Sequence, residues 1–150
     1  MLLNKVNLIN AMIAAISAPE GLLRMSEYKH EISPEMYIRF TPRADEPCGT
    51  AYCMAGWANK LQGRPPEDLT QAALDLGLNN EQRHALFLFR KEYASNNRDH
   101  LVAFDTVLTR VQQKAIVIDL LTNLRDTGTF SVRESWEKCA PGTSPHGLDV

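Results

Sequence analysis

A chain of 150 residues with 44% hydrophobic and 23% charged residues has the length and composition of one globular domain, which excludes an extensively disordered protein. The formal net charge of −2 excludes the strongly basic surface with which a protein neutralises many phosphates. Three cysteines, an odd number, argue against a closed disulfide framework and favour a reducing compartment, so we expect a cytoplasmic protein.

The N-terminal segment predicts a helix from Asn4 to Ser17, which Pro19 and Gly21 end. Its apolar run is much shorter than the roughly 20 residues that a membrane span needs. We therefore interpret it as a core helix and expect no membrane association. The predicted inward stripe of this helix contains Leu2, Val6, Ile9, Met12, Ile13 and Ile16.

Five further helices are predicted, over residues 51–61, 67–76, 80–89, 101–108 and 110–126. Thr50 is expected to be the N-cap of the first of them. Asn79 with Gln82, and Thr109 with Gln112, have the spacing of capping boxes, in which each residue satisfies a backbone N–H of the other.

The helix over residues 110–126 has the clearest pattern. Its predicted inward face contains Val111, Ala115, Val117, Ile118, Leu121 and Leu124, and its predicted outward face contains Gln113, Asp119, Asn123 and Asp126. Beyond it we expect a minor extended segment near residues 130–133 and a flexible C-terminal tail at residues 139–150. The predicted fold is all-α, a single compact domain of about six short helices over residues 1–138.

The most distinctive segment runs from Cys48 to Ala58 and packs two cysteines, two glycines and one tryptophan into eleven residues. One interpretation is a structural junction in which Cys53 and Trp57, four residues apart, share one buried helix face. Another is a recognition surface, because tyrosine and tryptophan dominate interface energetics. The candidate binding residues are Cys48, Gly49, Thr50, Tyr52, Cys53, Gly56 and Trp57.

Two chemical interpretations of the cysteines stay open. A thiol just before a helix N-terminus has a lowered pKa, so Cys48 is the only candidate catalytic residue, as a nucleophile. Its general base would be one of four histidines that no local pattern distinguishes, His30, His84, His100 or His146. A four-ligand zinc set would combine Cys48, Cys53, Cys139 and His146, although the spacing of the last two is unusual. We expect no metal and no cofactor.

Basic and aromatic residues between Arg83 and Arg98 give a weaker signal. A basic face with aromatic platforms is typical of single-stranded nucleic-acid binding. Because Glu81 and Glu92 dilute the charge and the aromatic residues fit a helix core equally well, nucleic acid is not the expected partner. The residues concerned are Arg83, Phe87, Phe89, Arg90, Lys91, Tyr93 and Arg98.

The distinctive segment resembles the core of a family of small uncharacterised bacterial and phage proteins, Cys-Gly-Thr-x-x-Cys-x-Ala-Gly-Trp/His-Ala. That core is intact here as Cys48-Gly49-Thr50, Cys53 and Ala55-Gly56-Trp57-Ala58. Weaker matches extend the resemblance over about residues 1–136. The resemblance implies a helical fold and a phage or mobile-element context, and it carries over no catalytic residue.

We therefore expect a small non-enzymatic interaction protein, encoded by a phage or mobile element, that binds a host or phage protein in the host cytoplasm and can inhibit it. The first alternative is a cysteine-dependent enzyme with Cys48 as its nucleophile. The second is a zinc-stabilised or nucleic-acid-binding module. The main expectation depends on a distinctive motif that has no recognisable catalytic partner.

Overall fold

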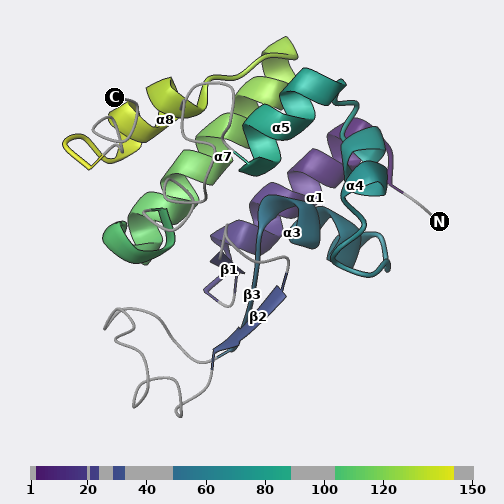
Figure 1. Ribbon diagram of the computed structural model, residues 1–150, viewed down its shortest axis with the longest axis horizontal. Helices are drawn as coiled ribbons and strands as arrows, with labels where there is room; N and C mark the ends of the chain where they lie inside the picture. Colours follow the sequence, from purple (N-terminus) through teal and green to yellow (C-terminus); the bar gives the residue numbers. More distant parts are fainter. Residues whose placement is uncertain (1–2, 20, 24–28, 33–48, 89–103, 144–150) are drawn as a thin grey trace.

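The computed structural model describes residues 3–19, 21–23, 29–32, 49–88 and 104–143 (Figure 1). Its helices are α1 (Lys5–Ser17), α3 (Met54–Leu61), α4 (Leu69–Asp75), α5 (Asn80–Leu88), α7 (Arg110–Thr127) and α8 (Val132–Cys139). One further helical turn covers residues 104–107. Its strands are β1 (Leu22–Leu23), β2 (Lys29–Ile32) and β3 (Gly49–Tyr52). Helix dominates this part of the chain, which confirms the predicted fold class.

Side-chain caps place most helix starts where the sequence predicts them. The side chain of Asn4 accepts a hydrogen bond from the first turn of α1 at 2.8 Å. Both predicted capping boxes form, because Asn79 and Gln82 exchange hydrogen bonds at the start of α5, and Thr109 and Gln112 do so at the start of α7. These starts are local events, since each needs only residues three positions apart.

A small three-stranded sheet, which the sequence analysis did not predict, lies at one end of the helical body (Figure 1). The central strand β3 pairs with β1 in parallel and with β2 in antiparallel orientation. The expectation that a helix starts after Thr50 was therefore wrong. Residues 49–52 are extended because the ladder with two other strands satisfies their backbone groups, and the helix begins only at Met54.

The inward face of α1 differs from the predicted stripe. Val6 is 49% exposed, whereas Leu8, which was not in the stripe, is fully buried. Ile9, Met12 and Ile16 are buried as predicted. The face is rotated because α1 packs against both α7 and α3, so it must bury a wider arc than one stripe provides.

The inward face of α7 is also rotated. Val111 is 74% exposed although it was predicted to face the core. Gln113, predicted to face water, is 1% exposed and donates from Nε2 to the backbone carbonyl of Phe104 at 3.0 Å. The apolar core positions of α7 are Ile116, Val117, Leu120, Leu121 and Leu124. A buried amide is tolerated here because it satisfies carbonyls of the preceding helical turn.

The C-terminal part of α1 is tied to the N-terminal part of α7. Lys114 donates to the backbone carbonyl of Ala18 at 2.6 Å, and Arg110 donates to that of Pro19 at 3.4 Å. These carbonyls follow the last turn of α1, where cations also interact favourably with the helix dipole. These bonds hold the C-terminal end of α1 against the N-terminal end of α7, close to the point from which β1 departs (Figure 1).

Residues 130–133 do not form the predicted extended segment, because α8 begins at Val132 and packs on α7. Trp136 of α8 is fully buried and meets Phe104 edge to face, with ring centroids 5.7 Å apart. Cys139 ends α8, and residues 139–143, which were predicted to belong to a flexible tail, have a defined conformation. Trp136 Nε1 in α8 donates a hydrogen bond to Thr143 Oγ1 at 3.1 Å. The rest of the predicted tail, residues 144–150, lies outside the described residues.

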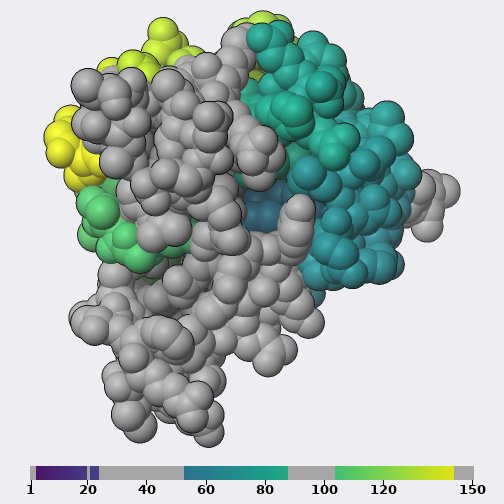
Figure 2. Space-filling model, viewed as in Figure 1, coloured from purple at the N-terminus to yellow at the C-terminus, as the bar shows by residue number. Residues whose placement is uncertain are grey.

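Helices from distant parts of the sequence share one core. In the space-filling view, the atoms of α4 and α5 (teal) and those of the C-terminal segment around α8 (yellow) lie on opposite sides (Figure 2). Between them runs one apolar core to which α1, α3, α5, α7 and α8 all contribute. Among the described residues, no helix is both long and apolar enough to cross a membrane.

Candidate functional site

The distinctive segment forms the junction between β3 and α3, and Cys53 is the residue that connects the strand to the helix. Cys53 has the extended backbone of an N-cap (φ −74°, ψ 177°), and its Sγ accepts a hydrogen bond from the Gly56 backbone N–H at 3.3 Å. The thiol therefore takes the capping role that the sequence analysis gave to Thr50. A sulfur atom is a weak acceptor, so this cap depends on burial as well as on hydrogen bonding.

Trp57 connects this junction to β1. Its side chain is 5% exposed, and its indole Nε1–H donates to the backbone carbonyl of Leu22 at 2.8 Å. Leu22 belongs to a strand that is only two residues long, so this bond satisfies one of its few polar groups. Trp57 is a core residue in this conformation, and its ring is not on a recognition surface.

The Cys53 thiol lies in surroundings that oppose its ionisation. Burial raises the pKa of Cys53 to about 11, and the negative charge of Asp105 acts in the same direction. Hydrogen bonds from the Gly56 and Ala55 backbone lower this pKa but do not outweigh burial. A thiol becomes a nucleophile only as the thiolate. Cys53 is therefore built for packing and capping, and the arrangement gives it no acid–base or nucleophilic chemistry at neutral pH.

We expect Cys53 to resist alkylation in the native protein. At pH 8 its rate with iodoacetamide should be at least about a hundredfold below that of the same residue in 6 M guanidinium chloride, because the folded thiol is both buried and protonated. Mass spectrometry of peptides from native and denatured samples measures both rates. Fast native labelling of Cys53 would contradict this assignment, and the labelling of Cys48 in the same sample tests the enzyme alternative directly.

The remaining candidate residues of the segment divide into three groups. Gly49, Thr50 and Tyr52 lie in β3, where Gly49 pairs with Ile32, Thr50 with Glu31, and Tyr52 with both Leu23 and Lys29. Gly56 is buried within α3. Cys48, the only candidate catalytic residue, lies outside the described residues. Within the described residues, the structure thus makes residues 49–58 the junction between β3 and α3, with residues 53–58 buried.

The other residues of the chemical alternatives are not gathered at one place by the described part of the chain. Cys139 is half-buried at the end of α8, and its partners in the proposed zinc set, Cys48 and His146, lie outside the described residues. Within the described ranges, no group of three or more His, Cys, Asp or Glu side chains could hold a metal ion. Phe87 is 3% exposed, so it belongs to the core. Arg83, from the same candidate nucleic-acid set, lies on α5. The other members of that set lie outside the described residues: Phe89, Arg90, Lys91, Tyr93 and Arg98.

A polar network between α7 and α8 was missed by the sequence analysis, which placed Asp119 in water. Asp119 accepts hydrogen bonds from Ser135 Oγ at 2.6 Å and from Lys138 Nζ at 2.9 Å, and from Asn123 Nδ2 at 3.5 Å. Burial alone would raise the pKa of Asp119, but the bonds from Ser135 and Lys138 lower it below its ordinary value. Because Ser135 is 1% exposed, its hydroxyl cannot reach a substrate, and the network fastens α8 to α7.

Replacing Asp119 by alanine should lower the free energy of unfolding by about 1–2 kcal/mol at pH 7, because the buried Ser135 hydroxyl loses its acceptor. The folded-state pKa of Asp119 is lowered, so its contribution is complete above the unfolded-state pKa and is lost as pH falls through the folded-state value. Urea unfolding should therefore show a gap between wild type and D119A that narrows below about pH 4. Asp126→Ala is the control, since the exposed Asp126 pairs only with its neighbour Arg125.

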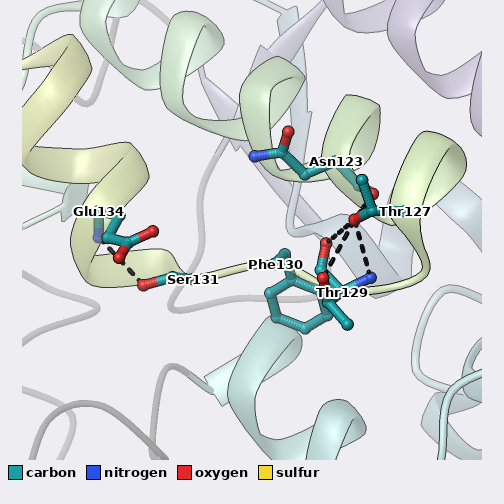
Figure 3. Close-up of a pocket in the computed structure, with 6 residues that line it drawn as sticks. All are labelled: Asn123, Thr127, Thr129, Phe130, Ser131 and Glu134. Carbon is teal, nitrogen blue, oxygen red and sulfur yellow. Dashed lines mark hydrogen bonds between the residues drawn. The ribbon is translucent and has the colours of Figure 1, made fainter.

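The described surface is hollowed beside this network. The hollow, of about 310 Å³, lies between the last turn of α7 and the first turn of α8. Its lining residues are Asn123, Thr127, Thr129, Phe130, Ser131 and Glu134 (Figure 3). They surround it as Figure 3 shows, with Glu134 on one side, Thr127 and Thr129 on the other, and the Phe130 ring between them. The polar residues Asn123, Thr127, Thr129 and Ser131 around the end of α7 were its only sequence signal, and the sequence analysis did not use them for this purpose.

Comparison of the chain with protein-family models, with curated proteins and with solved structures gives no match. The resemblance of the Cys48–Ala58 segment to a bacterial and phage family therefore remains an expectation drawn from its motif.

Proposed function

We propose that this chain is a small non-enzymatic binding protein that acts on another protein of a phage or its bacterial host, and that it inhibits the protein it binds. The observation that carries the proposal is the interior position of Cys53 and Trp57. Cys53 and Trp57 hold α3 against β1 inside the protein, so a partner must be recognised by other residues, on the surface. The phage or mobile-element context comes from the resemblance of the motif, and with it a cytoplasmic location in the host.

Two titratable groups among the described residues, Cys53 and Asp119, fit a binding role better than a catalytic one. The Cys53 thiol is protonated at neutral pH, and the carboxylate of Asp119 is engaged by three donors. Catalytic acids and bases need a pKa matched to their task and access to the substrate. Neither group meets both conditions.

The test is a pull-down of the tagged full-length protein from lysate of a bacterial host, washed at high salt and quantified by mass spectrometry. We expect one protein to be retained in stoichiometric amount, and we expect the purified pair to form a complex of defined mass in light scattering. The Cys48→Ser variant is the matched control, and it should retain the same protein. The proposal would be overturned if the wild-type protein retained no partner and turned over a substrate, and if the Cys48→Ser substitution abolished that turnover.

A further inference from the structure

The hollow between α7 and α8 is large enough to receive one side chain. Its volume of about 310 Å³ is at the lower end of the range of roughly 300–1,000 Å³ for pockets that enclose small molecules. Thr127, Thr129 and Glu134 are exposed, and Asn123, Phe130 and Ser131 are only half-buried. A shallow hollow of this kind suits a group that is presented from outside on a larger body.

The hydrogen-bonding groups around the hollow leave acceptors in excess. Thr127 Oγ1 lies 2.8 Å from the Asn123 carbonyl and 3.0 Å from Thr129 Oγ1, so both hydroxyl protons are used within the turn. The Asn123 amide nitrogen donates one N–H to Asp119, so Asn123 has one N–H donor left beside the two lone pairs of Oδ1. Glu134 adds a carboxylate. A ligand that satisfies this set must bring donors.

The charge of the hollow is negative and uncompensated by the described residues. None of them forms an ion pair with Glu134, although cations lie nearby in the sequence. Arg125 is bonded to Asp126 and Asn10, Lys138 is bonded to Asp119, and Arg133 also has a partner of its own. The C-terminal end of α7, which borders the hollow, carries the negative end of a helix dipole.

We propose that this hollow receives the guanidinium group of an arginine side chain. A guanidinium offers several donors in one plane and a positive charge, which match the Glu134 carboxylate and Asn123 Oδ1. Its flat face can also stack on the Phe130 ring, which lines the hollow. A sugar hydroxyl can also donate to these acceptors, but a sugar carries no positive charge and would leave the charge of Glu134 uncompensated. The inference rests on the proposed binding function, with the arginine carried by the protein partner.

The first arm of the test is a titration of the full-length ¹⁵N-labelled protein with N-acetyl-arginine amide at low ionic strength. We expect saturable shifts confined to the backbone amides of Asn123 to Glu134, with a dissociation constant in the millimolar range, as suits a side chain detached from its protein. Glu134→Gln preserves the size of the side chain and should weaken binding about tenfold or more, since a charge-assisted hydrogen bond is lost. Glu137→Gln removes the same charge from an exposed position of α8 outside the hollow, and it should leave binding unchanged.

Three results would overturn the assignment. They are the absence of saturable shifts, equal binding of the neutral isostere N-acetyl-citrulline amide, and equal or tighter binding of the lysine analogue or of a methyl glycoside. Micromolar binding of free arginine would instead identify a small metabolite as the source of the guanidinium and would overturn the partner-borne side chain.

The second arm separates this inference from the proposed function. If E134Q loses the protein that wild type and E137Q retain in the pull-down, the hollow is the recognition site. If E134Q retains that protein with unchanged affinity, the binding function stands and the arginine receptor is wrong.

Discussion

Replacing Trp57 by phenylalanine should lower the free energy of unfolding by about 2–4 kcal/mol. The substitution removes the indole N–H that donates to the Leu22 carbonyl at 2.8 Å, so that buried carbonyl loses this donor. It also removes part of a ring that is 95% withdrawn from solvent, since Trp57 is 5% exposed. Urea unfolding followed by far-ultraviolet circular dichroism measures the loss.

The matched control is the same substitution at the other tryptophan. Trp136 is fully buried, but its Nε1 donates to the Thr143 hydroxyl in a part-buried turn, where water can replace the lost donor. W136F should therefore cost less than W57F, with the difference reflecting the lost bond to the Leu22 carbonyl. Equal losses in the two variants would show that ring volume alone matters and that the bond between Trp57 and β1 contributes nothing.

Replacing Gly21 by alanine should also lower the free energy of unfolding by about 2–4 kcal/mol, because there is no room for a Cβ atom. That atom would lie 2.1 Å from the Ala15 carbonyl oxygen and 2.8 Å from Ile16 Cα, and both are backbone atoms of α1 that no rotamer change can move. Relieving the clash would push β1 away from α1. The loss should appear both in urea unfolding and as a lower melting temperature.

Gly63→Ala is the control for Gly21→Ala. Gly63 has φ +73°, and a Cβ there would have nothing within 4 Å. The alanine is strained but not in contact with other atoms, so its cost should be about 1 kcal/mol. If G63A proves as destabilising as G21A, then loss of backbone freedom rather than close approach to α1 explains the Gly21 effect.

Both predictions concern the same joint of the molecule. Gly21 lets the chain leave α1 closely enough for Leu22 to reach Trp57, and Cys53 starts the helix that carries Trp57. Variants at this joint should change stability before they change binding. Variants of the hollow between α7 and α8, such as E134Q, should change binding without unfolding the protein. Measuring stability and binding for both sets of variants therefore tests the binding surface independently of the core.

The sequence by itself determined the features that depend on residues three or four positions apart. It identified α1, α4, α5 and α7, the start of α1 next to Asn4, both capping boxes, and the C-terminal end of α7. In the structure the C-cap of α7 is Gly128, where the backbone is left-handed with φ 75°. These features follow from side-chain oxygens meeting nearby N–H groups and from the freedom of glycine. One of the open interpretations of the sequence, in which Cys53 and Trp57 share a buried helix face, agrees with their burial in the structure.

Only the tertiary structure decided the features that depend on distant partners. Residues 51 and 52 were expected to begin a helix capped by Thr50, but pairing with β1 and β2 makes residues 49–52 a strand and moves the cap to Cys53. The faces of α1 and α7 are rotated because each helix packs on more than one neighbour. Asp119 is an exposed charge by pattern and a half-buried anchor for α8 in the fold. In each case a residue far along the chain satisfies a polar group or covers an apolar one, and no local spacing encodes that contact.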